Sequence, residues 1–229
     1  MSIFTSANNT KVFTHPEAHP HRLDLAAEVI GKMFVPVAPI DPSDRSQTRI
    51  CETIDLGRTI GQNHLVTVDK NDLTFMWDRG RGYESHMVLK DTEDETRITT
   101  VLFWDGDNNK WILWTNFEGV EGLPEPGCDR YNNAPEEFKK KCQEFWATHA
   151  LVPTEDEKVK YLKENDVDIE DIENNIEAEE WTICYDDISD VGPFGCYPDF
   201  AYRENVKEAI DFALNQIANN IGVSYISAN

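Results

Sequence analysis

The segment between residues 57 and 90 gathers arginine, glycine, histidine and serine in a chain that is otherwise strongly acidic. Arg79 and Arg81 alternate with two glycines, and His86 follows shortly after them. Arginine forks match the oxygens of phosphate or carboxylate, and glycine lets the backbone approach a ligand closely. A histidine beside such a ligand would serve as a general acid or base. The pattern therefore predicts a local site for an anion.

Two histidines with arginines would suffice for metal-independent cleavage of RNA. One of His64 and His86 would take the proton of the 2'-hydroxyl, and the other would protonate the leaving oxygen. Arginine would stabilise the charged transition state, and hydroxyl groups would donate hydrogen bonds to the phosphate. The predicted catalytic residues are His64, Ser85, His86 and Thr115, and the predicted ligand-binding residues are Arg79, Gly80, Arg81 and Gly82.

The same residues also fit a structural role. Arginine and glycine are common in hairpin turns, and single histidines on strands are more often structural than catalytic. If acidic neighbours such as Asp78 and Glu84 occupy the arginines, the cluster is an ordinary charged turn. Both interpretations stay open at the level of sequence.

The chain shows no pattern for a cofactor or a metal ion. Its five cysteines are widely spread without a C-x-x-C pair, and phosphate-binding or dinucleotide-binding glycine motifs are absent from the sequence. The histidines near the N-terminus are interrupted by Pro16 and Pro20, which prevent a helical face that would bring them together. We therefore predict neither a cofactor nor a dedicated metal site.

The elements that must position these residues read as an α+β fold. Short segments rich in β-branched and aromatic residues lie between residues 64 and 117, separated by polar or glycine-bearing turns. They predict one antiparallel sheet of about five strands, with a hairpin turn at Asp105 to Asn109. Helical periodicity at 22–34 and 134–152 predicts helices packed on one face of that sheet.

Three regions are expected along the chain. Residues 1–21 read as an irregular tail, residues 22–152 as an α+β core domain, and residues 153–229 as an acidic, mainly helical region. In that last region we expect a helix capped by Thr154 and Glu157, a second short helix marked by isoleucines at 169, 172 and 176, one strand at 180–187, and a final helix at 203–221.

The charge narrows the classes of partner. The formal net charge of −22 repels nucleic acid and anionic membranes at long range. From residue 152 onward the chain holds 19 acidic and 5 basic residues, a net charge of −14 that leaves −8 for the first 151 residues. Because the N-terminus resembles no secretion signal and no apolar run is long enough to span a bilayer, we expect a cytoplasmic protein without membrane contact.

Several motifs together resemble a family. The runs "GRTIGQNHLV", "RGRGYESHMV", "RITTVLFWDGDNNKWILWTNFEG" and "EFWATHALV" are similar to an uncharacterised family of short bacterial and phage proteins across residues 57–152. In outline the segment also resembles ribonuclease toxins of the barnase, EndoU, colicin and RelE kind. The resemblance implies an RNA-directed core around the predicted site residues, and it does not cover the acidic C-terminal third.

Two functions follow as hypotheses. The first is a ribonuclease-like core that binds or cleaves RNA or a nucleotide at the local basic site, as a phage or bacterial conflict protein would. The alternative is a non-enzymatic acidic interaction or inhibitor protein, a nucleic-acid mimic whose carboxylates along 155–190 bind a basic protein partner. A halophilic or merely highly soluble scaffold is the third interpretation.

Overall fold

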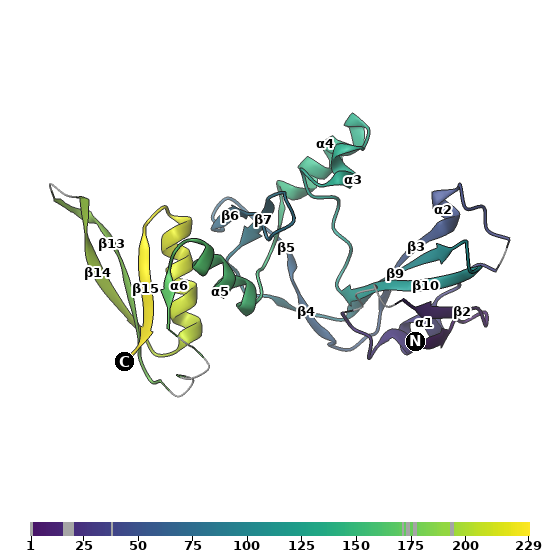
Figure 1. Ribbon diagram of the computed structural model, residues 1–229, viewed down its shortest axis with the longest axis horizontal. Helices are drawn as coiled ribbons and strands as arrows, with labels where there is room; N and C mark the ends of the chain where they lie inside the picture. The colour runs from purple at the N-terminus through teal and green to yellow at the C-terminus, as the bar shows by residue number, and fades with distance from the viewer. Residues whose placement is uncertain are drawn as a thin grey trace. The chain divides into compact units, whose positions relative to one another are not determined.

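The structure is a computed structural model that describes residues 2–15, 21–37, 39–170, 172, 175, 178–192 and 195–229. The chain forms two compact units (Figure 1). Unit 1 comprises Met1–Leu65 and Thr92–Gly122, and unit 2 comprises Val66–Asp91 and Leu123–Asn229. Neither unit is continuous in sequence, because the chain passes between the units at three places.

Unit 1 is built on a five-stranded sheet with the order β1-β2-β10-β9-β3. Its strands are β1 (Ile3–Thr5), β2 (Lys11–Thr14), β3 (Arg49–Asp55), β9 (Arg97–Asp105) and β10 (Lys110–Glu118). β10 runs parallel to β2, and the other neighbouring strands are antiparallel. The remaining elements of unit 1 are α1 (Ala26–Lys32), α2 (Arg45–Thr48) and the paired strands β4 (Gly61–Asn63) and β8 (Glu93–Glu95).

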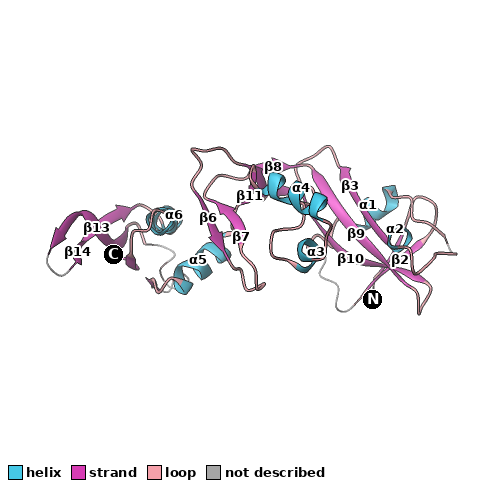
Figure 2. Cartoon of the chain, turned by 90° about the horizontal axis from the view of Figure 1, so that it is seen from above, coloured by secondary structure: helices cyan, strands magenta, loops and turns pink. Residues whose placement is uncertain are grey.

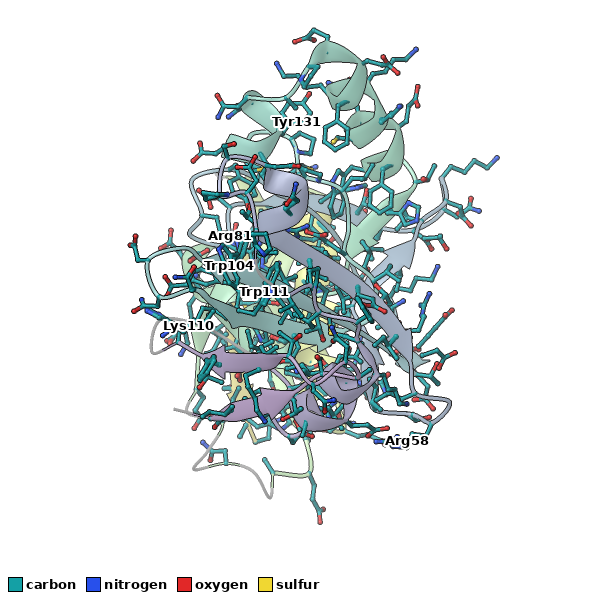
Figure 3. The ribbon with its side chains drawn as sticks, turned by 90° about the vertical axis from the view of Figure 1, so that its right-hand side faces the viewer. Arg58, Arg81, Trp104, Lys110, Trp111 and Tyr131 are labelled. Carbon is teal, nitrogen blue, oxygen red and sulfur yellow. The ribbon has the colours of Figure 1, made fainter. Side chains whose placement is uncertain are left out.

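The core of unit 1 joins α1 to the sheet. Ile30 of α1 belongs to the same buried cluster as Leu102 of β9 and Trp111 of β10. The ring of Trp104 meets that of Trp111 edge-on, with 5.5 Å between the centroids, and both side chains are labelled in Figure 3. The indole nitrogen of Trp111 donates a hydrogen bond of 2.9 Å to the carbonyl of Pro36, so this buried polar group is satisfied.

The hairpin of β9 and β10 forms where the sequence predicts it. Asp105 accepts hydrogen bonds from the backbone and the side chain of Asn108, at 3.1 Å and 2.8 Å. Asn109 takes a positive φ of 48°, which asparagine tolerates better than most residues. The predicted turn at Asp105 to Asn109 is confirmed.

Unit 2 contains a first sheet with the order β5-β11-β7-β6. Its strands are β5 (Leu65–Thr67), β6 (Thr74–Trp77), β7 (Ser85–Val88) and β11 (His149–Leu151), and it is accompanied by α3 (Asp129–Asn132) and α4 (Glu136–Trp146). β6 and β7 are antiparallel, whereas β7 and β11 are parallel. Val66, Val88, Ala150 and Val152 form the small apolar cluster of this sheet.

Unit 2 also contains a second sheet with the order β12-β15-β13-β14. Its strands are β12 (Asp168–Ile169), β13 (Trp181–Gly192), β14 (Gly195–Arg203) and β15 (Val223–Ala228), and its helices are α5 (Glu155–Glu164) and α6 (Val206–Ala218). Ile210 and Leu214 of α6 are buried in one cluster with Trp181 and Ile183 of β13. The final helix therefore packs against the protein through its apolar stripe, as its periodicity predicts.

The α+β class is confirmed, but the prediction of one antiparallel sheet over residues 64–117 is wrong. The strands of that range are divided among three sheets: β9 and β10 belong to the main sheet of unit 1, β8 pairs with β4, and β5 to β7 belong to unit 2. A period of two identifies a strand but does not identify its neighbour, because pairing depends on distant segments.

The irregular tail predicted for residues 1–21 is also wrong. β1 and β2 form an antiparallel hairpin whose turn contains Asn9 at a positive φ of 64°. Val12 of β2 is fully buried and lies opposite Trp111 of β10. The tail therefore completes the sheet of unit 1, and its residues 16–20 lie outside the described part.

The C-terminal region differs from the prediction in two respects. Among its described residues more lie in strands than in helices, because β14 and β15 accompany the predicted strand and the final helix. The isoleucine pattern expected to form a short helix instead places Ile169 in β12, while residue 176 lies outside the described residues. The units also do not follow the predicted boundary at 152, since residues 66–91 belong with the C-terminal part.

Candidate functional site

The Arg-Gly-Arg-Gly sequence forms the turn between β6 and β7. The carboxylate of Asp78 accepts hydrogen bonds from the backbone N–H groups of Gly80, Arg81 and Gly82, at 2.9, 2.8 and 3.1 Å. The two glycines take positive φ values of 84° and 75°, a conformation that side chains disfavour. These bonds, the one from Arg81 first, hold the pKa of Asp78 below its usual value. The turn therefore does bind an anion, and that anion is its own Asp78.

Arg79 is occupied by a distant carboxylate. Its guanidinium forms an ion pair with Glu157. Both side chains are largely buried, with exposed fractions of 18% for Arg79 and 25% for Glu157. Glu157 also accepts the backbone N–H of Thr154 at 3.0 Å, completing the capping box that begins α5. The ammonium of Lys160 donates to the carbonyl of Arg79 at 3.3 Å. These contacts tie the turn to the first turns of α5.

Arg81 is held more loosely. Its guanidinium lies 3.5 Å from a carboxylate oxygen of Glu125, and its side chain is 48% exposed against 11% for Glu125. The second oxygen of Glu125 is buried and has no hydrogen-bond partner among the described residues. Arg81 is therefore the less constrained of the two arginines.

His86 joins β7 to the last residue of α4 and to β11. Its Nδ1 lies 2.9 Å from the backbone oxygens of both Trp146 and His149. Since carbonyl oxygens only accept hydrogen bonds, Nδ1 must carry the proton, and the neutral ring then has its acceptor at Nε2. Ser85, next in sequence, is fully buried, and its hydroxyl has no partner in the described part of the chain. A buried hydroxyl is not offered to a phosphate from solvent.

The candidate residues are divided between the two units. Arg79, Arg81, Ser85 and His86 all belong to the β6–β7 hairpin of unit 2. His64 lies between β4 and β5 in unit 1, and Thr115 lies on β10 just after an irregularity in its pairing with β9. The two predicted histidines thus belong to different units.

Sequence reasoning missed the residues that determine the state of the turn. Glu157 and Glu125 lie 78 and 44 positions beyond their arginine partners, so local spacing gives no sign of the pairing. Asp78 was recognised as a possible partner, but it binds the backbone of the turn rather than a guanidinium. The capping-box spacing of Thr154 and Glu157 was the available signal, since it marked Glu157 as a structured carboxylate.

Two further properties concern ligands and membranes. No group of three or more histidine, cysteine, aspartate or glutamate side chains in the described ranges is placed to hold a metal ion. Among the same residues no helix combines the length and the apolar character that crossing a bilayer requires.

Comparison of the chain with family models, with curated proteins and with solved structures found no match. The resemblance to short bacterial and phage proteins and to ribonuclease toxins therefore stays a prediction.

Proposed function

We propose that the protein is a non-enzymatic acidic interaction protein that binds a basic protein partner, in the manner of an inhibitor or a nucleic-acid mimic. The observation that carries the proposal is the concentration of unneutralised carboxylates in the C-terminal region. Residues 152–229 have a net charge of −14, from 19 acidic and 5 basic residues. Asp156, Asp168 and Glu204 are exposed and form no ion pair with any described residue.

Unneutralised carboxylates favour a basic partner for an electrostatic reason. Their mutual repulsion raises the free energy of the free protein, and a positive surface brought against them lowers it. The same field speeds the encounter with a basic protein and repels the phosphates of RNA. Part of the predicted 155–190 surface, residues 171, 173, 174, 176 and 177, lies outside the described residues.

The contacts of the β6–β7 turn weigh against the ribonuclease hypothesis. A phosphate bound there would have to displace Glu157 from Arg79 and Glu125 from Arg81. It would also compete with Asp78 for the N–H groups of the turn. Each exchange replaces a carboxylate that is already in place, so the turn has little to offer an external anion.

The test compares a lysine decapeptide with an RNA oligonucleotide, both fluorescently labelled, in titrations of the full chain. We expect the peptide to bind and the binding to weaken steeply between about 0.1 M and about 1 M salt, because exposed charges are screened within roughly 8 Å at physiological ionic strength. The RNA should neither bind nor be cleaved.

A pair of matched variants distinguishes the effect of the C-terminal carboxylates on binding from the effect of the overall negative charge. The first combines Asp156→Asn, Asp168→Asn and Glu204→Gln. The control combines Asp91→Asn, Glu93→Gln and Asp107→Asn, which remove the same charge from exposed positions before residue 152. The peptide should bind the first variant more weakly than the control. Equal loss in both variants, or RNA binding that disappears in Arg79→Ala and Arg81→Ala, would overturn the proposal.

A further inference from the structure

The sheet β12-β15-β13-β14 has one face covered by α6 and one face that no described helix of unit 2 packs against (Figures 1 and 2). Trp181 and Ile183 of β13 point to the α6 side, where they belong to the buried cluster. Since successive side chains of a strand point to opposite faces, Cys184 and its alternate neighbours lie on the other side. We call that other side the open face.

The strand register places aromatic and acidic side chains on the open face. Cys184 lies opposite Phe200 of β14 on one side and Tyr225 of β15 on the other. Asp168 of β12 continues the same row beyond Tyr225. In the next row, Tyr202 of β14 lies opposite Thr182 of β13, whose other neighbour is a serine of β15.

The aromatic side chains of the open face remain in contact with water. Phe200 and Tyr202 are 45% and 56% exposed, although Cys184 and Thr182 between the strands are almost completely covered. Cross-strand neighbours therefore shield the small residues while the rings present their own surface outward. Exposed rings grouped in this way mark an interaction site more often than single exposed apolar residues do.

The charge of the open face is negative. Asp168 and Asp186 lie on it, by register and by alternation along β13. Arg203 is the only cationic residue of the four strands, among the residues that the structure describes, and it lies on the α6 side, with its guanidinium 4.2 Å from the ring centroid of Phe212. The open face thus carries carboxylates and ring faces without a compensating cation from its own strands.

The combination of aromatic rings and carboxylates on the open face favours a cationic partner. Ring faces attract arginine and lysine through their negative quadrupole, and the carboxylates beside them attract the same cations. A second copy of the chain would bring the carboxylates of the open face against each other, and RNA would bring phosphates against them. We infer that the open face docks an arginine- or lysine-rich segment of a partner protein. The inference rests on the proposed function and locates its contact surface.

The test uses an octa-arginine peptide and the full chain labelled with nitrogen-15. In the native protein, amide resonances of β13, β14 and β15 should shift on titration more than those of unit 1. Phe200→Ala and Tyr202→Ala together should weaken binding by about fivefold or more, because each ring in contact with a cation contributes measurably. Tyr197→Ala is the matched control: it removes an exposed ring from the same strand, but from its opposite face, and should change affinity less than about twofold.

The outcomes separate this inference from the function on which it rests. Binding of octa-arginine that is equal in the native protein, the double variant and the control, with shifts spread over both units, would overturn the open face and leave the acidic interaction function standing. Failure of both the lysine and the arginine peptide to bind the native chain would overturn both. Circular dichroism of each variant shows whether a loss of binding reflects a loss of fold.

Discussion

Asp78 satisfies three backbone N–H groups that the turn between β6 and β7 would otherwise expose. Such donors need an acceptor, and a carboxylate is the strongest one that a short chain segment can provide. The glycines at 80 and 82 serve this geometry through their positive φ. A Cβ at Gly82 would meet no atom within 4 Å, so that glycine is required by backbone conformation and not by the close approach of a neighbouring group.

The two arginines of the turn should differ in their effect on stability. Arg79→Ala breaks a largely buried ion pair with Glu157, and we expect the free energy of unfolding to fall by about 2 kcal/mol. Arg81→Ala removes a longer, half-exposed contact and should cost less than about 1 kcal/mol. Urea unfolding measures both. Arg58→Ala is the exposed reference, because Arg58 lies on the outside of unit 1 in Figure 3 and its pair with Glu28 is exposed to solvent. An Arg79 effect no larger than that reference would contradict the assignment.

The pH dependence of stability should report the Asp78 turn. The pKa of Asp78 is lower in the folded state than its ordinary value of 3.8, because the backbone N–H of Arg81 and those of the glycines stabilise the charged form. A carboxylate whose pKa is lowered by folding stabilises the folded state at pH values above its unfolded-state pKa. That contribution is lost as the pH falls through the folded-state pKa. Asp78→Asn should therefore unfold with a flatter dependence below pH 3.8 than the native chain. Identical acid unfolding of the two proteins would be inconsistent with the turn geometry.

At the scale of elements, the sequence predicts best those segments whose pattern is local. α1, α6, β13 and the β9–β10 hairpin lie where periodicity and turn residues place them, because their apolar spacing is complete within a short window. β14 escaped prediction because it contains Gly195 and Pro198 and is exposed along most of its length, so it lacks the alternation of a half-buried strand.

The pairing between distant strands could not be predicted from the sequence. β2 pairs with β10 although about 100 residues separate them along the chain, and three-residue strands such as β1 carry too little pattern to be recognised. The partners of the two arginines could not be predicted for the same reason. The motif of Arg79 and Arg81 was correctly placed on a turn, but the carboxylates that occupy it come from segments far along the chain.

One buried ammonium, that of Lys158, links α5 to α6. Lys158 is 7% exposed and its Nζ lies 2.6 Å from Asp211 of α6 and 3.0 Å from Glu155. Burial lowers the pKa of this lysine, but the hydrogen bonds to Asp211 and Glu155 outweigh it and leave the pKa raised. Lys158→Ala should lower the free energy of unfolding by about 2 kcal/mol. Thermal unfolding measures the loss.

Lys158→Met provides the control for this contact. Methionine keeps most of the apolar stem and removes the charge, so it separates packing from ion pairing. We expect it to cost less than about 1 kcal/mol, because Asp211 and Glu155 are exposed enough to regain water once the ammonium is gone. A loss as large as that of Lys158→Ala would assign the stability to the ion pairs alone.

At the scale of the whole molecule, the two units are interleaved along one chain. The cluster around Ile30 and Trp111 belongs to unit 1, and the cluster around Trp181 and Ile210 belongs to unit 2. Residues 66–91 leave the sequence of unit 1 to join unit 2, where Trp77 donates a hydrogen bond of 2.8 Å to Glu164 of α5. A cut at residue 152 therefore divides unit 2 and leaves the sequence of unit 1 complete.

A fragment of residues 1–152 should lose order in the β6–β7 hairpin before it loses order in β9. The fragment lacks Glu157, which binds Arg79, and Tyr161, whose ring lies 4.9 Å from that of Phe75. Trypsin should then cleave after Arg79 and Arg81 many times faster than in the full chain. Cleavage after Arg97, which pairs with Glu95 inside unit 1, should stay slow in both, because local opening governs proteolysis. Mass spectrometry of timed digests gives both rates from one sample. Unchanged cleavage at the turn would mean that α5 does not hold it, whereas equal acceleration at Arg97 would mean that unit 1 depends on the C-terminal region.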